Sequence, residues 1–252
     1  MKIKNLHWLF SCSKLIISFT FAFLNLNTGK LKRINMWLVI KENKYFFISY
    51  AIFLIFGLII QLQYSQADIF LFVNLHYYLF GDFLFPHWTS LGDGLFSVFV
   101  VLFLLFFISY KDALIAAIVF LISSAIAQYL KNYIFPLNPR PQPFFLNLDE
   151  NIHIIKGVVI HQYNSFPSGH STSAFAVFCL LTLIWKKKQW GWLFFIIALS
   201  VGYSRMYLAQ HFFLDIYVGS IIGVLCALFF YWIFKNVKAR EWHYKAIFKK
   251  NL

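Results

Sequence analysis

Long apolar runs are the feature of this sequence that most constrains its fold. A helix that crosses the hydrocarbon layer of a bilayer, roughly 30 Å thick, needs about 20 predominantly apolar residues. Six stretches reach that length or can be extended to it by their flanks: residues 46–63, 91–108, 113–130, 171–185, 189–203 and 215–234. The sequence therefore predicts an all-α, polytopic membrane bundle with six transmembrane helices.

The composition agrees with a membrane protein and excludes other classes. Only 12% of the residues are charged and 61% are hydrophobic, whereas soluble domains carry about 25% charged residues. Disordered chains are poor in aromatic residues, but this chain contains 22%. The net charge of +13 is typical of a nucleic-acid partner. Because the chain is too apolar to be a soluble nucleic-acid binder, we expect membrane lipids and no nucleic acid as partners.

The positive charge is distributed unequally between the two predicted faces. Six spans place both termini on one side of the membrane, and 18 of the 22 Lys and Arg residues fall there, in residues 1–45, 186–188 and 235–250 and at Lys111. The positive-inside rule makes that side cytoplasmic. We therefore expect a multi-pass protein of the cell's inner (plasma) membrane. Four cations remain on the extracytoplasmic side, namely Lys131, Arg140, Lys156 and Arg205.

These patterns divide the chain into three parts. Residues 1–45 form a basic cytoplasmic segment, residues 46–234 the six-span domain and residues 235–252 a basic cytoplasmic tail. Residues 6–26 fit a signal peptide, a seventh span or an interfacial helix, and we favour a peripheral N-terminal helix. Residues 69–80 are apolar but interrupted by polar side chains, and we interpret them as one helix lying on the bilayer surface.

The three cysteines carry little functional information. Cys12, Cys179 and Cys226 form no CxxC pair, and two of them lie inside apolar runs. We interpret them as small apolar side chains. The sequence predicts neither a disulfide framework nor a thiolate metal site.

Three polar segments are expected to meet at the extracytoplasmic ends of the spans, at residues 131–141, 164–171 and 203–215. They bring together Lys131, Arg140 and Arg205. Cations without nearby carboxylates favour an anion, and the guanidinium fork of Arg matches phosphate oxygens. Ser168 and Gly169 add the N-terminus of a helix, which also binds anions.

Two histidines in these segments could perform chemistry. His211 and Asp215 are four residues apart and share a helix face. A carboxylate that accepts from one imidazole nitrogen leaves the other nitrogen free to attack. His170 is suited to donate a proton to a leaving oxygen. The set predicts phosphoryl transfer without a metal or cofactor.

Each part alone has an ordinary structural explanation. A histidine at a helix end is usually solvated or a cap, and an arginine near a membrane surface often anchors lipid headgroups. The conjunction of three segments with complementary roles on one face favours a site. Asp93 is interpreted as a helix cap, and Gln210 and His153 receive no role. His161, Tyr163 and Asn164 are candidates for contact with a substrate headgroup.

The three segments resemble the signature of the type 2 phosphatidic acid phosphatase superfamily, which also includes vanadium haloperoxidases, and in particular its bacterial membrane branch. The second part, Pro-Ser-Gly-His, matches residues 167–170. The third part, Ser-Arg, five residues, His, three residues and Asp, matches residues 204–215. The first part, Lys, six residues and Arg-Pro, departs here, because eight residues separate Lys131 from Arg140. We expect the two additional residues to bulge from a Pro-rich loop without moving its ends.

The resemblance implies a mechanism. His211 attacks phosphorus and forms a phosphohistidine, Asp215 orients His211, and His170 protonates the leaving oxygen and then activates water. The phosphate oxygens are held by Lys131, Arg140, Ser168, Gly169 and Arg205.

The resemblance also implies a hydrolase of cell-envelope lipid metabolism that acts on a lipid phosphate monoester or diphosphate. Family substrates include undecaprenyl diphosphate, lipid A phosphates, phosphatidylglycerophosphate and phosphatidic acid. Two alternatives stay open. One is a haloperoxidase, which the membrane character disfavours, and the other is a lipid-phosphate binder or transporter without chemistry. The sequence indicates neither the oligomeric state nor a role for Lys156.

Overall fold

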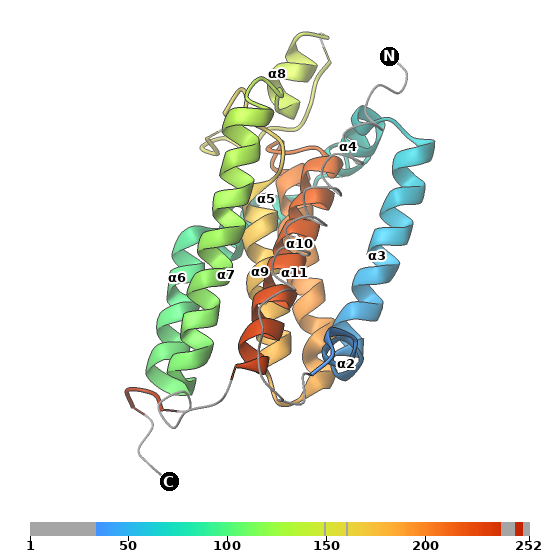
Figure 1. Ribbon diagram of the computed structural model, residues 1–252. Coiled ribbons are helices and arrows are strands. Elements are labelled where there is room, and N and C mark those ends of the chain that lie inside the picture. The colour runs from blue at the N-terminus through green and yellow to red at the C-terminus, as the bar shows by residue number, and fades with distance from the viewer. Residues whose placement is uncertain (1–33, 149, 160, 238–244, 249–252) are drawn as a thin grey trace. The chain divides into compact units, whose positions relative to one another are not determined.

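The computed structural model describes residues 34–148, 150–159, 161–237 and 245–248, and all regular elements within these ranges are helices (Figure 1). This confirms the all-α prediction for the described part of the chain. The helix predicted within residues 6–26 and most of the basic tail lie outside the described residues.

The helices follow the apolar runs of the sequence. The α-helices are α2 (Met36–Glu42), α3 (Lys44–Gln63), α4 (Gln66–Asn74), α5 (Leu79–Trp88), α6 (Gly94–Phe103), α7 (Tyr110–Tyr129), α8 (Pro141–Leu146), α9 (Gly169–Ile184), α10 (Gly191–Tyr207) and α11 (Phe213–Asn236). Short 3₁₀ turns are η1 (Thr89–Gly92) and η4 (Lys188–Trp190), and π-helical turns are η2 (Leu104–Ile108) and η3 (Leu130–Ile134).

The number of membrane crossings stays a prediction. Each of the six predicted spans overlaps a helix. Within the described ranges, three helices are long and apolar enough to cross a bilayer: Lys44–Gln63, Tyr110–Ile134 and Phe213–Asn236. The bent pair Gln66–Asn74 and Leu79–Gly92 would be a fourth if it counts as one span. The helices Gly94–Ile108 and Gly169–Ile184 are apolar but shorter.

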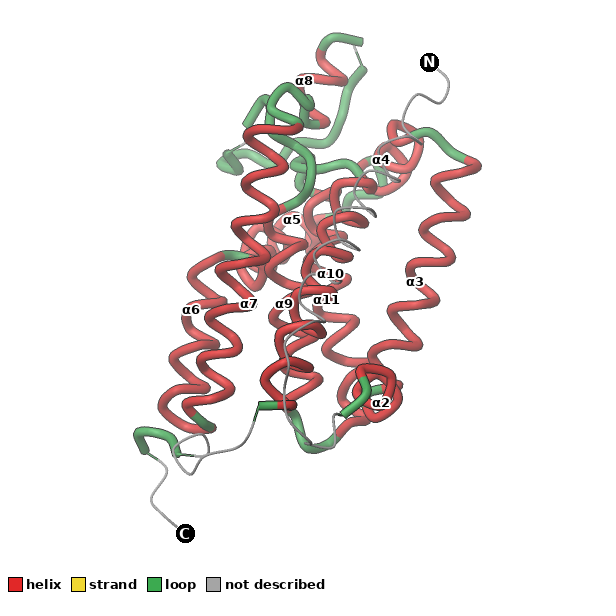
Figure 2. The backbone as a smooth tube through the Cα atoms, in the orientation of Figure 1, coloured by secondary structure: helices red, strands yellow, loops and turns green. Residues whose placement is uncertain are grey.

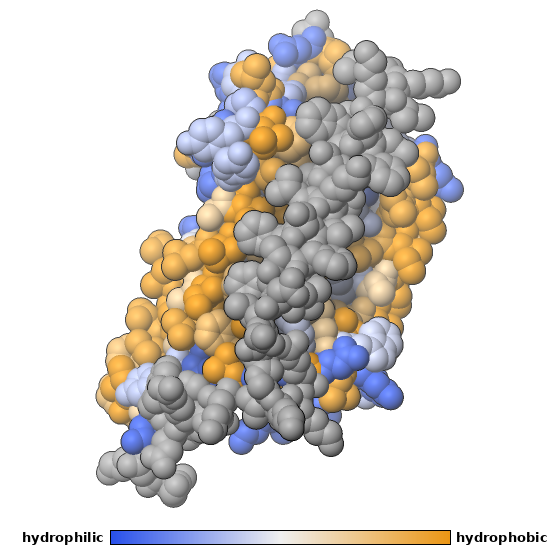
Figure 3. Space-filling model, in the orientation of Figure 1, coloured by the Kyte–Doolittle hydropathy of each residue, from blue (hydrophilic) through white to orange (hydrophobic). Residues whose placement is uncertain are grey.

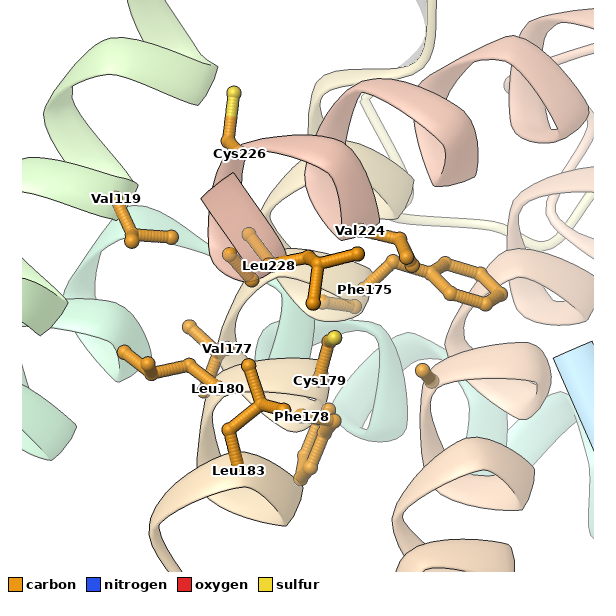
Figure 4. Close-up of a cluster of buried hydrophobic side chains, with 14 of the residues drawn as sticks. Val119, Phe175, Val177, Phe178, Cys179, Leu180, Leu183, Val224, Cys226 and Leu228 are labelled. Carbon is orange, nitrogen blue, oxygen red and sulfur yellow. The ribbon is translucent and has the colours of Figure 1, made fainter. Parts of the chain in front are cut away.

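Helix α9 lies at the centre of the bundle and packs against α7, α10 and α11 (Figure 1). The main apolar core lies among these helices, and Figure 4 shows the part that Val119 of α7, Phe175 of α9 and Leu228 of α11 contribute. Cys179 and Cys226 are free and buried in this core, as their sequence context predicts. Cys12 lies outside the described residues.

Two glycines let α11 approach the backbone of α9. A Cβ atom at Gly219 would lie 2.7 Å from the carbonyl oxygen of Ser168, and one at Gly223 would lie 2.8 Å from the amide nitrogen of Ala176. Membrane helices commonly use small residues four apart for such close packing. The contact fixes the start of α9 beside the start of α11, where the predicted catalytic residues lie.

The prediction of a single helix over residues 69–80 is wrong. The chain breaks after α4, and the axes of α4 and Leu79–Gly92 differ by 114° (Figure 2). The Asn74 side-chain amide donates to the His153 carbonyl at 3.0 Å and accepts from the His153 amide at 2.8 Å. It also donates to the carbonyl of Tyr207. The Tyr207 hydroxyl bonds both backbone polar groups of Tyr78. These long-range bonds replace the helical bonds that the break removes.

The two ends of the bundle differ in composition. Helix ends with exposed basic side chains gather at one end, at α2 and in the turn between α9 and α10, and the ends that carry the candidate site gather at the other (Figure 1). Exposed apolar side chains form much of the described surface between the two ends that Figure 3 shows in colour. This distribution fits a bundle surrounded by lipid.

Candidate active site

A cavity of about 630 Å³ lies where the three polar segments meet. Six of the eight predicted site residues line it: Lys131, Arg140, Gly169, His170, Arg205 and His211. Asp215 lies behind His211, and Ser168 lies outside the wall. The structure thus brings together residues that are up to 84 positions apart in the sequence.

Lys131 reaches the cavity from the π-helical turn η3 at the end of α7. The Phe135 amide donates to the Leu130 carbonyl at 2.8 Å, five residues back. Since an α-helical turn closes over four residues, η3 takes up one residue more. This widened turn absorbs one of the two additional residues between Lys131 and Arg140. A Cβ atom at Gly169 would lie 4.0 Å from Lys131 Nζ, so the ammonium faces the start of α9.

Arg140 is held by backbone and side-chain acceptors. Its Nε donates to the Tyr163 carbonyl at 3.1 Å, and its Nη1 donates to the side chain and the carbonyl of Gln210, at 2.9 and 3.3 Å. Burial lowers the pKa of the Arg140 guanidinium, and the negative charge of Asp215 opposes this shift. The guanidinium is oriented without an ion pair among the described residues.

Arg205 is almost completely buried near the end of α10. Its Nη1 donates to Thr89 Oγ1 of η1 at 2.6 Å, and its buried Nε has no protein partner in the described part of the chain. The Arg205 carbonyl accepts from the amides of Gln210 and His211, at 2.9 and 3.2 Å. These bonds turn the chain after α10 and place His211 beside Arg205.

His211 and Asp215 form the expected pair. His211 Nδ1 lies 3.2 Å from Asp215 Oδ2, which also accepts from the Phe212 amide at 3.0 Å and from the Ser165 hydroxyl. Because the carboxylate accepts at Nδ1, we assign the imidazole proton to that nitrogen. This assignment leaves Nε2 with a free lone pair.

The surroundings of His211 favour the neutral imidazole. Its side chain is 1% exposed. Burial lowers the pKa of His211 well below its usual value, and the positive charges of Arg140, Arg205 and Lys131 act in the same direction. A neutral ring at physiological pH is the form that can act as a nucleophile.

His170 is the second residue of α9 and lines the same cavity. A Cβ atom at Gly92 would lie 2.6 Å from the His170 carbonyl oxygen. The absence of a side chain at Gly92 therefore lets η1 pack directly against the backbone beside His170.

The structure does not bring the Ser168 side chain to the cavity. The Ser168 Oγ caps α9 by accepting from the Ser171 amide at 3.4 Å and from the Ser171 hydroxyl at 3.0 Å. The Ser168 amide donates to the Asp215 carbonyl at 3.0 Å. Ser168 therefore positions the helix that carries Gly169 and His170.

Sequence reasoning missed three residues that hold the site. Ser165 bonds Asp215, Thr89 bonds Arg205, and Gln210 bonds Arg140. Gln210 and Ser165 each lie within a polar segment that was singled out, but nothing in their spacing indicates a partner. Asp93 caps α6 as expected, with Oδ1 2.6 Å from the Gly94 amide, and also lines the cavity.

The other polar residues of the loops divide between the cavity and a separate cluster. His161 lines the cavity. His153 instead bonds Asp82 at 2.8 Å and stacks on Tyr77 with ring centroids 3.8 Å apart. Within the described ranges, no three His, Cys, Asp or Glu side chains gather as metal ligands would.

Comparisons with known proteins agree with this geometry. The family model of the PAP2 superfamily matches residues 112–239. The chain is 34% identical over 112 residues to the bacitracin transport permease protein BcrC of Bacillus licheniformis, covering 44% of this chain and 52% of the relative. It is 27% identical over 145 residues to lipid A 4'-phosphatase of Porphyromonas gingivalis, covering 54% and 60%. The chain thus spans between half and three-fifths of the length of these relatives.

Two crystal structures resemble the fold. LpxE of Aquifex aeolicus superposes with a TM-score of 0.56 at 26% identity, covering 65% of this chain and 93% of that one. A transmembrane PAP2-type phosphatidylglycerolphosphate phosphatase from Bacillus subtilis superposes with a TM-score of 0.56 at 23% identity, covering 79% and 98%. The second likeness concerns the fold alone.

Proposed function

Because the chain belongs to the PAP2 superfamily, we propose that it is an integral membrane phosphatase that hydrolyses a lipid phosphate monoester or diphosphate at the extracytoplasmic face. The observation that carries this proposal is the buried His211–Asp215 pair on a cavity with three cations. None of these cations forms an ion pair among the described residues. A phosphate group would supply the missing negative charge.

The first chemical step uses the free nitrogen of His211. Nε2 forms a bond to phosphorus while the bond from phosphorus to the leaving oxygen breaks, which gives a phosphohistidine. The negative charge of the bound phosphate favours the protonated form of His170, and the leaving oxygen takes its proton from this imidazolium. Asp215 stabilises the positive charge that develops on the His211 ring.

The second step regenerates the enzyme. His170, now neutral, accepts a proton from a water molecule whose oxygen attacks phosphorus, and the bond to His211 Nε2 breaks. Lys131, Arg140 and Arg205 and the Gly169 amide bind the phosphate oxygens in both steps. Ser168 contributes by capping the helix that carries Gly169 and His170. These groups account for the reaction without a metal ion.

The membrane setting favours a lipid substrate, since acyl or prenyl tails can stay in the bilayer while the phosphate enters the cavity. The positive-inside rule supports an extracytoplasmic site in an inner (plasma) membrane, because the described basic residues of α2 and of the turn after α9 lie at the opposite end of the bundle. One relative is named for lipid A 4'-phosphatase activity and another is an undecaprenyl-diphosphatase. Lipid A phosphates and undecaprenyl diphosphate are therefore the first substrates to test.

A non-catalytic binder or transporter of lipid phosphates is the second candidate, because one relative is named as a transport permease. The two functions differ in phosphate release. We expect purified protein in detergent to release phosphate from at least one lipid phosphate, to keep this activity with a chelator and to lose it with vanadate.

The same assay tests the assignment of the nucleophile. His211→Ala should reduce release to the background rate, and His170→Ala should reduce it by about 10²–10⁴-fold. His87→Ala, at an exposed position of α5 whose side chain does not line the cavity, is the matched control and should keep activity. Wild-type activity in His211→Ala would refute the mechanism, and no release from any lipid phosphate would favour the binder.

A further inference from the structure

The cavity extends well beyond the phosphate-binding end. Helix α6 begins at Gly94, whereas α7 and η3 continue to Ile134, so the last turns of α7 rise past the start of α6 (Figure 1). Phe120, Ser124 and Gln128 line the cavity on the same helical face as Lys131. Lys131 lies 11 positions after Phe120, which corresponds to a rise of about 16 Å along the helix.

The wall of this extension carries neutral hydrogen-bonding groups. Ser124 and Gln128 of α7 and Ser173 of α9 line it, and their side chains form no hydrogen bond with the described residues. Several other described helical serines donate to a carbonyl one turn back, as Ser204 does to Val201 and Ser220 does to Tyr217. Hydroxyl and amide groups left open on a cavity wall can bind an uncharged polar ligand.

Asp93 adds one negative charge to this wall. Its Oδ1 accepts from the Gly94 amide, so the start of α6 fixes the position of the carboxylate. Asp93 follows Gly92, which packs on the His170 backbone, and η1 also contacts Arg205 through Thr89. The carboxylate is therefore held at the junction between the phosphate-binding end and the neutral extension.

The charges match one phosphate group better than two. All three Lys and Arg side chains on the described cavity wall belong to the phosphate-binding set, namely Lys131, Arg140 and Arg205. A second phosphate reaching into the extension would find no further cation and would approach Asp93, and like charges disfavour binding. A hydroxyl group in the same place could donate to the Asp93 carboxylate.

We propose that the extension is a subsite for an uncharged, hydroxyl-bearing headgroup, such as a sugar ring, and that Asp93 makes the protein select phosphate monoesters of such lipids over lipid diphosphates. This inference rests on the proposed phosphatase function. It narrows the substrate class of the same site.

The test compares three substrates in detergent: farnesyl diphosphate, farnesyl monophosphate and a glycolipid monophosphate. The two farnesyl compounds share a tail and differ by one phosphate. The wild type should prefer the monophosphate in kcat/KM, and the glycolipid phosphate should be used best. Asp93→Asn should raise kcat/KM for the diphosphate relative to the monophosphate by about tenfold, because it removes the like charge.

The variants separate charge from helix capping. Asn and Ser are both good N-caps, so Asp93→Asn and Asp93→Ser keep the start of α6. Both variants should raise kcat/KM for the diphosphate relative to the monophosphate. Asp112→Asn, in the first turn of α7 away from the cavity, is the charge-matched control. Ser124→Ala combined with Gln128→Leu should lower kcat/KM for the glycolipid phosphate relative to farnesyl monophosphate.

The outcomes distinguish this inference from the proposed function. The proposed subsite would be overturned, and the phosphatase function kept, if the wild type preferred farnesyl diphosphate. The same would follow if Asp93→Asn and Asp112→Asn had equal ratios of kcat/KM for the diphosphate to kcat/KM for the monophosphate. Failure to release phosphate from all three substrates would instead overturn the proposed function.

Discussion

Gln210 contacts Arg140 through an amide, a group that orients a guanidinium without cancelling its charge. Its Oε1 accepts from Arg140 Nη1 at 2.9 Å, and its Nε2 donates to the Val159 carbonyl at 2.8 Å. The same side chain therefore fixes a phosphate-binding cation and the loop that lines the cavity. Arg140 keeps its full positive charge available for an anion.

The neutrality of Gln210 can be tested with Gln210→Glu. A carboxylate would pair with Arg140 and weaken phosphate binding by about tenfold, since hydrogen bonds to charged groups contribute about 1.5–3 kcal/mol. The carboxylate is charged above its own pKa, so the defect should be full at high pH and shrink as the pH falls and the side chain takes up a proton. An adjacent positive charge lowers the pKa of a carboxyl group below the usual value of about 4.3 for Glu. The measurement is therefore the inhibition constant of orthophosphate from pH 3 to 8, divided by the wild-type value at each pH.

Gln66→Glu is the control for this prediction. Gln66 accepts from the Leu214 amide at 2.9 Å near the start of α11 but does not line the cavity. If the inhibition constant of Gln210→Glu, divided by the wild-type value, stayed constant with pH, this would contradict the electrostatic explanation and indicate a purely steric role.

The residues of the site differ in how far the sequence predicts them. Charged side chains such as Lys131 and Arg205 stand out in an apolar chain, and the alternating direction of spans predicts that they share one face. Ser165 and Gln210 are neutral, and their roles depend on the loop that folds back between α8 and α9. Sequence spacing carries no information on such contacts, because the partners are set by tertiary packing.

At the scale of elements, apolar runs predict where helices form but not where they break. The break between α4 and α5 depends on Asn74, whose partners His153 and Tyr207 are 79 and 133 residues away. The close approach of α9 and α11 likewise depends on which face of α11 carries Gly219 and Gly223. Since α9 carries His170 and α11 carries Asp215, this helix packing sets the geometry of the site.

Gly223→Ala tests the packing of α9 against α11. An alanine Cβ would collide with the Thr172 carbonyl oxygen and come within 2.8 Å of the Ala176 amide nitrogen. Overpacking of this kind costs about 1–3 kcal/mol, which exceeds the gain of up to about 1 kcal/mol from the higher helix propensity of Ala. We expect a lower unfolding temperature in detergent together with lower kcat.

Ala125→Val provides the comparison, because it adds apolar volume on the exposed surface of α7. It should leave the unfolding temperature nearly unchanged. If Gly223→Ala were as stable and active as the wild type, the helices would have room to separate, and the glycine contact would not determine the site.

At the scale of the whole molecule, the exposed basic turns and the cavity lie at opposite ends of the bundle. The basic turns near Lys111 and Lys187 gather at one end, and the cavity lies at the other, between the start of α9 and the end of α10 (Figure 1). The sequence predicts this polarity because each span reverses direction. Basic residues are retained on the cytoplasmic side during insertion.

The predicted orientation can be measured with single cysteines in a Cys12→Ser background, because the two other native cysteines are buried. Lys156 and Lys187 are both exposed and lie at opposite ends of the bundle. With the cavity facing outward, a membrane-impermeant maleimide should label Lys156→Cys in intact cells. It should label Lys187→Cys only after the membrane is permeabilised. The reverse pattern would place the cavity in the cytoplasm, where a phosphatase of this orientation could not act on lipids of the outer leaflet.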